Sequence, residues 1–99
     1  MLFRSTWLAA PAEWCVLEYA AQDKSRGYAG VFRLASGEAE YRFRPKGVDR
    51  AATYEVTLDN DHTVFTISGR ELADSGLFIR LDAAMTSELV FYRKERGGL

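Results

Sequence analysis

Few side chains in this sequence have the chemistry that catalysis needs. His62 is the only histidine and Cys15 the only cysteine among 99 residues. A thiol nucleophile needs a base within hydrogen-bond reach. Cys15 lies in the apolar run WCVL (residues 14–17), which predicts a buried and inert thiol, whereas His62 ends the polar run DNDH (residues 59–62), which predicts an exposed turn. These two residues therefore make a weak catalytic pair, and a lone cysteine forms no intrachain disulfide.

Other patterns of reactive residues are incomplete. Asp59, Asn60 and Asp61 look like the start of a calcium loop, but the glycine and the distal glutamate of an EF-hand loop do not follow them. A hairpin turn explains the same residues, because Asp and Asn tolerate turn backbone angles. The sequence contains no G-x-S-x-G nucleophile elbow, and its glycines are spaced as turn residues. We therefore expect no catalytic residue, no metal and no cofactor, so that this chain alone is not an enzyme.

The aromatic residues are the remaining candidates for ligand contact. They make up 13% of the sequence and would suit a sugar-stacking platform. Most of them fall on faces that are already apolar by alternation, which favours packing. Trp7 differs, because it follows polar Ser5 and Thr6 and precedes the turn at Pro11. We place Trp7 on an exposed surface, as a contact to carbohydrate or to another domain.

Composition narrows the class of protein and its partners. A chain of 99 residues with 47% hydrophobic and 27% charged residues is one globular domain, residues 1–99. The net charge of −1 excludes the basic footprint of a nucleic-acid binder, even though Arg42 and Arg44 form a small basic cluster. No apolar stretch approaches the roughly 20 residues that span a bilayer, and Arg4 interrupts the apolar start of the chain. We therefore expect no membrane contact and a cytoplasmic location.

The residue pattern predicts an all-β fold, an antiparallel β-sandwich of the Greek-key type. Short alternating or apolar runs separated by turn residues predict about eight strands. Residues 13–21 are apolar on both faces, which predicts a central strand covered on both sides. Residues 69–76 predict one short helical turn, with Ser68 as its cap and Gly76 as its end. The expected strands are residues 2–8, 13–21, 28–34, 39–45, 53–58, 63–68, 77–81 and 87–94.

The order of several short motifs resembles a known domain. The run YRFRPKGVD (residues 41–49), followed by YEV (54–56), is similar to the R-L-x-L-K-G-L-D … Y-x-V segment of the C-terminal β-sandwich domain of glycoside hydrolase family 36, the α-galactosidases. GRELADSGL (69–77) resembles the G-x-x-L-x-x-x-G-L motif of that domain, and SELVF (87–91) its closing strand. Pro45 and Val48 depart from the family pattern, which leaves the substrate of the parent enzyme open.

The resemblance implies an accessory role. In that family two catalytic aspartates lie on a (β/α)8 barrel that precedes this domain, and no residue here corresponds to them. The resemblance therefore implies a non-catalytic C-terminal domain that packs on a catalytic barrel absent from this chain and stabilises it. Arg42 or Arg44 would pair across that domain contact, and an exposed apolar patch on one sheet face would support the hypothesis.

Two other functions stay open. A carbohydrate-binding module would present two or three exposed aromatic side chains beside polar groups and would bind oligosaccharide. A stand-alone protein-interaction module would bind a partner that has no connection with sugars. The sequence also leaves homo-oligomerisation open.

Overall fold

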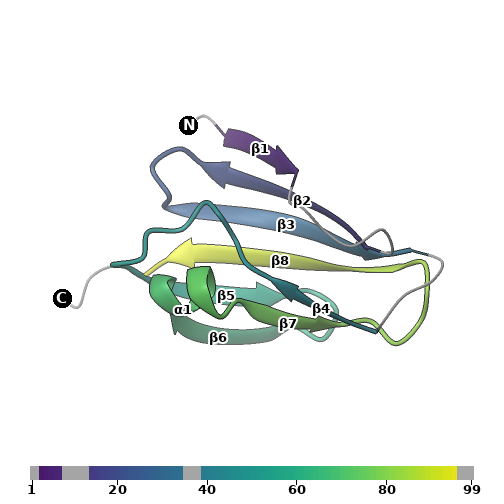
Figure 1. The fold of residues 1–99 in the computed structure, drawn as a ribbon. Helices are drawn as coiled ribbons and strands as arrows, with labels where there is room; N and C mark the ends of the chain where they lie inside the picture. Colours follow the sequence, from purple (N-terminus) through teal and green to yellow (C-terminus); the bar gives the residue numbers. More distant parts are fainter. Residues whose placement is uncertain (1–2, 8–13, 35–38, 96–99) are drawn as a thin grey trace.

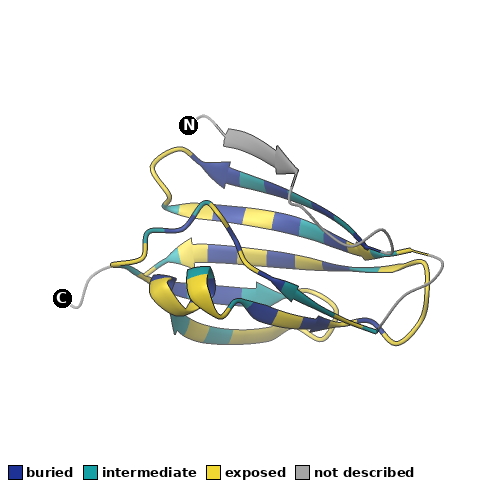
Figure 2. Cartoon of the chain, viewed as in Figure 1, coloured by how far each residue is buried: buried dark blue, intermediate teal, exposed yellow. Residues whose placement is uncertain are grey.

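The chain folds into eight strands and one helix within the part that the computed structural model describes, residues 3–7, 14–34 and 39–95. The elements are β1 (Phe3–Trp7), β2 (Trp14–Ala21), β3 (Arg26–Arg33), β4 (Glu40–Phe43), β5 (Thr53–Leu58), β6 (Thr63–Ser68), α1 (Gly69–Asp74), β7 (Leu77–Arg80) and β8 (Thr86–Lys94). The strands β3, β7 and β8 alternate more and less buried side chains (Figure 2).

The strands form two antiparallel sheets, which confirms the predicted all-β sandwich. A six-stranded sheet has the order β1-β2-β3-β8-β5-β6, and β4 pairs with β7 in a second sheet (Figure 1). The chain leaves the large sheet after β3, and its last strand returns between β3 and β5. Because of this order, a long connection returns the chain to a place beside a strand that is distant in sequence, as in Greek-key folds.

The hydrophobic core lies between the large sheet and the layer formed by β4, β7 and α1. Val16, Val31 and Val56 on the large sheet are fully buried, as are Phe43 on β4 and Leu72 on α1. Figure 1 shows the small sheet and the helix on one face of the large sheet. We call that covered face the inner face and the opposite one the outer face. The outer face is not covered by any described element.

The prediction for residues 13–21 is only partly correct. β2 buries Trp14, Val16 and Ala20 as expected, but it lies next to the edge strand β1 and is not central. Cys15, Leu17 and Tyr19 lie on the outer face and are only half-buried. An apolar pattern on both faces of a strand does not show whether the same chain or a partner supplies the second cover.

The predicted helical turn is confirmed with both of its ends. The Ser68 hydroxyl accepts a hydrogen bond from the Glu71 N–H (3.1 Å), which caps the first turn of α1. At the other end Gly76 adopts a φ of +73°, which glycine tolerates without strain, and its N–H donates to the Glu71 carbonyl (2.9 Å). Among the described residues no helix has the length and apolar character to cross a membrane.

Candidate docking face

The outer face of the large sheet carries a continuous group of apolar side chains. Tyr28, Phe32, Leu89 and Phe91 are each about 40% exposed. Cross-strand pairing places them beside the half-buried outer side chains of β2, which are Cys15, Leu17 and Tyr19. Large apolar groups scattered singly are ordinary on a protein surface, but a contiguous patch marks an interaction site.

Aromatic rings form a row across three strands of this face. Tyr19 and Tyr28 are direct cross-strand partners whose ring centroids lie 5.1 Å apart in a stacked arrangement. Tyr28 is in turn paired with Phe91, at 6.2 Å between centroids. The rings therefore pack against one another on a surface that the described residues leave partly exposed. Such pairs are worth about 0.5–1.5 kcal/mol beyond their burial.

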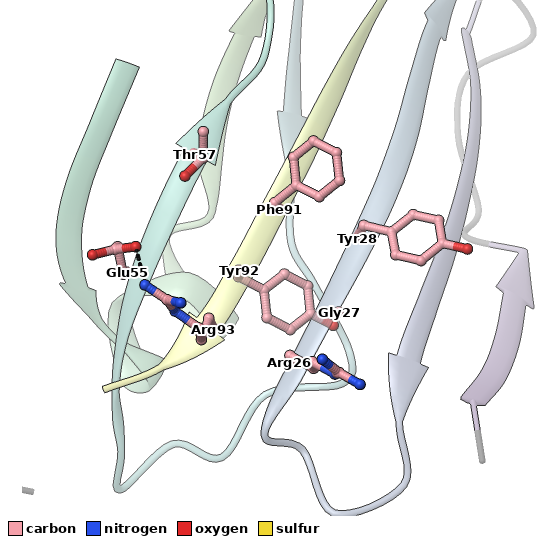
Figure 3. Close-up of a pocket in the computed structure, with 8 residues that line it drawn as sticks. All are labelled: Arg26, Gly27, Tyr28, Glu55, Thr57, Phe91, Tyr92 and Arg93. Carbon is pink, nitrogen blue, oxygen red and sulfur yellow. Dashed lines mark hydrogen bonds and ion pairs between the residues drawn. The ribbon is translucent and has the colours of Figure 1, made fainter. Parts of the chain in front are cut away.

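A hollow of about 450 Å³ opens at one end of the aromatic row (Figure 3). Its floor is formed by β3, β8 and β5, and Phe91 and Tyr28 stand on one side of it. The other side carries charged groups, of which Arg93 and Glu55 form an ion pair (Nη2 to Oε1, 2.8 Å). The lining residues are Arg26, Gly27, Tyr28, Glu55, Thr57, Phe91, Tyr92 and Arg93.

A buried carboxylate holds the sheet and the β4–β5 loop together on the inner side. Glu18 accepts hydrogen bonds from the backbone N–H groups of Lys46 (2.8 Å) and Gly47 (3.1 Å), and from the hydroxyl of Tyr92. A buried carboxylate is tolerated when hydrogen bonds replace its hydration. Burial, followed by the negative charge of Glu18, raises the pKa of Tyr92 far above its ordinary value. The phenol therefore remains a proton donor to the carboxylate.

Gly47 permits this close contact because it has no side chain. A Cβ at this position would lie 2.2 Å from the Cβ of Ala20 and 2.8 Å from the hydroxyl of Tyr92. The K-G pair of the family-like run thus brings two N–H groups against Glu18, and its glycine avoids a steric clash.

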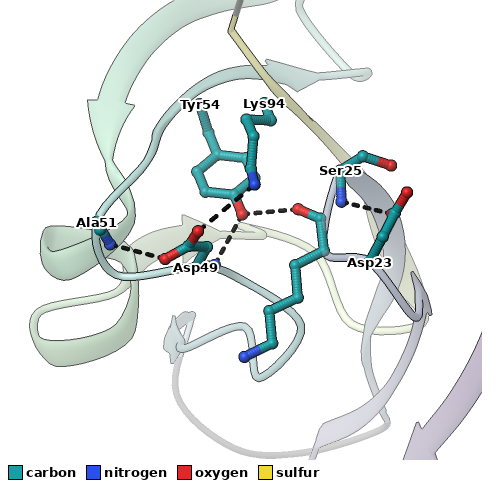
Figure 4. Close-up of polar contacts among 7 residues, drawn as sticks. Asp23, Ser25, Asp49, Ala51, Tyr54 and Lys94 are labelled. Carbon is teal, nitrogen blue, oxygen red and sulfur yellow. Dashed lines mark hydrogen bonds and ion pairs between the residues drawn. The ribbon is translucent and has the colours of Figure 1, made fainter. Parts of the chain in front are cut away.

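A second buried tyrosine ties two loops to the end of the sheet (Figure 4). The hydroxyl of Tyr54 accepts from the Asp49 N–H and donates to the Lys24 carbonyl, both at 2.7 Å. Burial raises the pKa of Tyr54. The Asp49 carboxylate accepts from the Ala51 N–H (2.9 Å) and lies 3.5 Å from Lys94 Nζ, and these contacts lower its pKa. The Y-x-V motif therefore has a structural role here.

The structure places Arg42 and Arg44 at the C-terminal end of α1. Arg42 Nη1 donates to the Ser75 carbonyl, and Arg44 Nε donates to the Asp74 carbonyl (3.1 Å). The Arg42 guanidinium also lies 4.1 Å from the ring centroid of Phe78. Cations near the last carbonyls of a helix are favourable. Both arginines thus belong to the layer opposite the outer face.

The other predicted site residues are not brought together. Trp7 pairs in register with Leu17, and its side chain lies outside the described residues. His62 is exposed in a turn with a φ of +55°, as predicted. The Asn60 N–H donates to Glu88 Oε1 (2.9 Å), which explains this turn as a structural one. The prediction of a buried thiol at Cys15 is wrong, because Cys15 lies half-buried on the outer face.

Sequence reasoning missed the residues that the structure emphasises. Glu18 carried a detectable signal, because it stands at the same alternating phase as Val16 and Ala20 and is therefore a charged residue at a core position. Arg26 and Arg93 carried no such signal, because their proximity depends on the pairing of β3 with β8, which are far apart in the sequence.

Among the residues that the structure describes, no three His, Cys, Asp or Glu side chains come close enough to hold a metal ion. The outer face and its hollow present aromatic rings, apolar side chains and the Arg93–Glu55 ion pair.

Comparison with solved structures identifies the same fold within much longer chains. The α-galactosidase from Lactobacillus brevis superimposes with a TM-score of 0.72 and 17% identity, covering 94% of this chain and 14% of that one. A family 36 α-galactosidase from Geobacillus stearothermophilus, solved with raffinose, gives 0.70 and 16%, covering 92% and 13%. A putative α-N-acetylgalactosaminidase from Bacillus halodurans gives 0.67 and 14%, covering 93% and 20%.

This chain therefore spans no more than a fifth of the length of these three relatives. A comparison with curated proteins finds no match. The family model described as the glycosyl hydrolase family 36 C-terminal domain matches residues 14–92, which include all of the strands from β2 to β7 and most of β8. The chain therefore belongs to the family of glycosyl hydrolase family 36 C-terminal domains.

Proposed function

We propose that this chain is a non-catalytic accessory domain that packs through its outer face on the (β/α)8 catalytic barrel of an α-galactosidase-like glycoside hydrolase and stabilises that barrel. The exposed apolar patch of Tyr28, Phe32, Leu89 and Phe91 carries the proposal. Covering a sheet face that carries such side chains is favourable by about 25 cal/mol per Å² of apolar surface removed from water. The chain covers the inner face itself, and the barrel would cover the outer one.

The relation to activity is indirect. The described residues offer contacts for packing, and the resemblance to family 36 assigns the reaction to aspartates on the barrel. A partner that binds the folded barrel but not the unfolded one stabilises the folded barrel by mass action. The size of this stabilisation depends on the concentration of the partner and on its affinity for the barrel. The accessory domain would thus act on how long the enzyme survives and leave the chemical step to the barrel.

Of the residues predicted for the domain contact, one lies on the strand beside the proposed docking face and two lie in the opposite layer. Trp7 is paired with Leu17, an outer-face residue, and it remains a candidate for the contact. Arg42 and Arg44 bind the end of α1 in the opposite layer, so their principal role would be inside this domain. Their pairing with another domain, a cytoplasmic location and homo-oligomerisation all remain predictions.

The test uses the family 36 catalytic barrel encoded by the same genome, produced with and without this chain. Titration calorimetry should show saturable binding, and the melting temperature of the barrel should rise by several degrees. F91D places a charge in the centre of the proposed contact and should weaken binding at least tenfold. Met85, 73% exposed in the turn before β8, offers a control of equal charge in M85D. Absence of such a barrel, absence of binding, or equal effects of F91D and M85D would contradict the proposal.

A second candidate function is carbohydrate binding, and the aromatic row supports it. Tyr28 and Phe91 are exposed beside Arg26 and Glu55, which is the combination of stacking and polar groups that a sugar site uses. Titration of the chain with melibiose or raffinose at millimolar concentration tests this function. Heat or NMR shift changes at Tyr28 and Phe91 would support it, and unchanged spectra would exclude it.

A further inference from the structure

The strand β6 lies at one end of the large sheet and pairs with β5 on one side only (Figure 1). We call the side of β6 that is turned away from β5 its free edge. The strand sequence TVFTIS contains no charged residue, proline or glycine, and its pairing with β5 runs without a bulge. Natural edge strands commonly carry lysine, proline or a bulge, which prevents another strand from adding to them. The free edge of β6 has none of these features.

Two hydrogen bonds show which residues of β5 direct their backbone groups toward β8. The Thr53 carbonyl accepts from the Glu95 N–H (2.8 Å), and the Asp59 N–H donates to the Leu89 carbonyl (3.0 Å). Both bonds join the β5 side of the sheet to β8 or to the residue that follows it. Successive residues of an antiparallel strand direct their N–H and C=O groups to alternate sides. The odd-numbered residues of β5 therefore face β8, and the even-numbered ones, such as Val56, face β6.

The free edge of β6 thus presents the backbone groups of Val64 and Thr66. Phe65 is the direct partner of Val56, so its N–H and C=O face β5. Val64 and Thr66 flank Phe65, and their N–H and C=O groups therefore point to the free edge. No hydrogen bond across the free edge to another described segment is present at these two residues. The free edge can therefore accept a further strand.

We propose that the free edge of β6 pairs with the same edge of a second copy of this chain, which joins two six-stranded sheets into one across a two-fold axis at Phe65. In this register Val64 lies opposite Thr66 of the second copy, and each such pair exchanges both of its N–H···O bonds. The same surface meets itself, as a two-fold interface requires. A neutral strand suits this role, because like charges directly opposite each other destabilise a sheet.

Side chains on both faces of the sheet favour this register. Phe65 is partly buried on the inner face and packs against the core, and on the axis it would meet Phe65 of the second copy. On the outer face Val64, which is 56% exposed, would pack beside Thr66 of the second copy. Such β-branched pairs suit a sheet. One pair of short strands is a small interface, so the dimer should form reversibly and depend on concentration.

The first test is sedimentation of the chain alone, from micromolar to millimolar concentration, which should show a reversible equilibrium between monomer and dimer. V64K places a lysine on the free edge without filling any buried space, and it should raise the Kd of the dimer by about tenfold or more. M85K is the control of equal charge, because Met85 is 73% exposed in the turn before β8. A chain that stays monomeric, or equal effects of V64K and M85K, would overturn the proposal.

Hydrogen exchange tests the free edge without any substitution. The amides of Val64 and Thr66 should exchange rapidly in the monomer and gain protection of about tenfold or more as the dimer forms. The amide of Phe65 faces β5 and should be protected at every concentration, which makes it the internal control. A dimer in which Val64 and Thr66 stay unprotected would show that the copies meet elsewhere, and the proposal would be wrong.

Disulfide cross-linking tests the register, in a C15A background that removes the native thiol. Val64 and Thr66 of the second copy would be about 5.5 Å apart between Cα atoms, which a disulfide can span. V64C chains mixed with T66C chains should therefore become linked in a glutathione redox buffer. V64C chains alone should link at least several-fold more slowly, because their sulfurs would be diagonal neighbours. Equal rates would contradict the two-fold axis at Phe65.

The inference is independent of the proposed docking, because its tests use the chain without the barrel. F91D, which should weaken docking through the outer face, should leave the Kd of the dimer unchanged. Loss of the dimer in F91D would show that two copies meet through the outer face and would overturn the inference. Protection of Val64 and Thr66 only in the presence of the barrel would assign the free edge to the barrel, and would overturn it as well.

Discussion

The hydroxyl of Tyr92 donates a hydrogen bond to the carboxylate of Glu18, which lies 74 positions earlier in the chain. The contact joins β8 to β2 across β3, and the same carboxylate binds the loop that leads from β4 to β5. The two layers are thus connected by a polar contact inside an apolar core. Removing one partner of such a contact costs more than the contact itself is worth, because the other partner stays buried.

Y92F tests the importance of that bond. The substitution keeps the ring in the core and removes one of the three hydrogen bonds to Glu18, so the free energy of unfolding should fall by about 1–3 kcal/mol. Urea denaturation followed by circular dichroism measures this change. A loss below about 0.3 kcal/mol would show that water or another donor replaces the hydroxyl.

Alkaline pH should destabilise the chain through the same residue. Burial and the charge of Glu18 raise the pKa of Tyr92 above its ordinary value of 10.0, so the folded chain keeps a proton that the unfolded chain releases. The associated stability is fully present below pH 10 and decreases as the pH rises above it, by up to about 1.4 kcal/mol per pH unit for one group. Denaturation between pH 8 and 11 measures this slope. Y92F should have a shallower slope, and equal slopes would contradict the assignment.

G47A should destabilise the chain by overpacking. The added methyl group would lie 2.2 Å from the Cβ of Ala20, and moving Gly47 away would disturb its N–H hydrogen bond to Glu18. We expect a loss of about 1–3 kcal/mol. G30A is the control, because the three atoms nearest to its methyl group would belong to the ring of Phe32, a side chain that is 41% exposed and can turn aside. Equal losses in the two variants would show that Gly47 is not required for close approach.

R42A should lower stability by loosening the end of α1. The variant loses the hydrogen bond to the Ser75 carbonyl and the contact with the Phe78 ring, together worth about 1 kcal/mol at this exposed position. For a domain of this size that corresponds to about 4–8 °C in melting temperature. R70A removes an exposed arginine of the same helix and should change the melting temperature little. A larger effect of R70A would contradict the role given to Arg42.

The strands, the turns and the helix caps follow from the sequence because they depend on neighbouring residues. The strand at residues 53–58, the cap at Ser68 and the helix end at Gly76 are confirmed, and the strand predicted at 39–45 is present over residues 40–43. The order of the strands does not follow in this way. The pairing of β3 with β8 joins residues that short turns do not connect, so local pattern contains no information about it.

The candidate docking face follows partly from the local sequence pattern and partly from the order of the strands. The sequence predicts apolar side chains on both sides of residues 13–21, and an apolar patch was the expected mark of an accessory domain. Only the fold shows that the second side lacks a cover from the described chain and that Tyr19, Tyr28 and Phe91 meet there in one row. The hollow with Arg26 and Arg93 depends wholly on this register, which explains why the sequence does not reveal it.

Hydroxyl-radical footprinting of the chain, alone and with the barrel, tests the proposed docking most directly, because it reports the solvent exposure of individual side chains on both layers in one experiment. We predict that oxidation of Tyr28 and Phe91 on the outer face falls several-fold in the complex, while oxidation of Phe78 and Met85 stays unchanged. Phe78 is 62% exposed and Met85 is 73% exposed in the free chain, so both are sensitive controls. Protection of Phe78 and Met85 without protection of Tyr28 and Phe91 would contradict docking through the outer face.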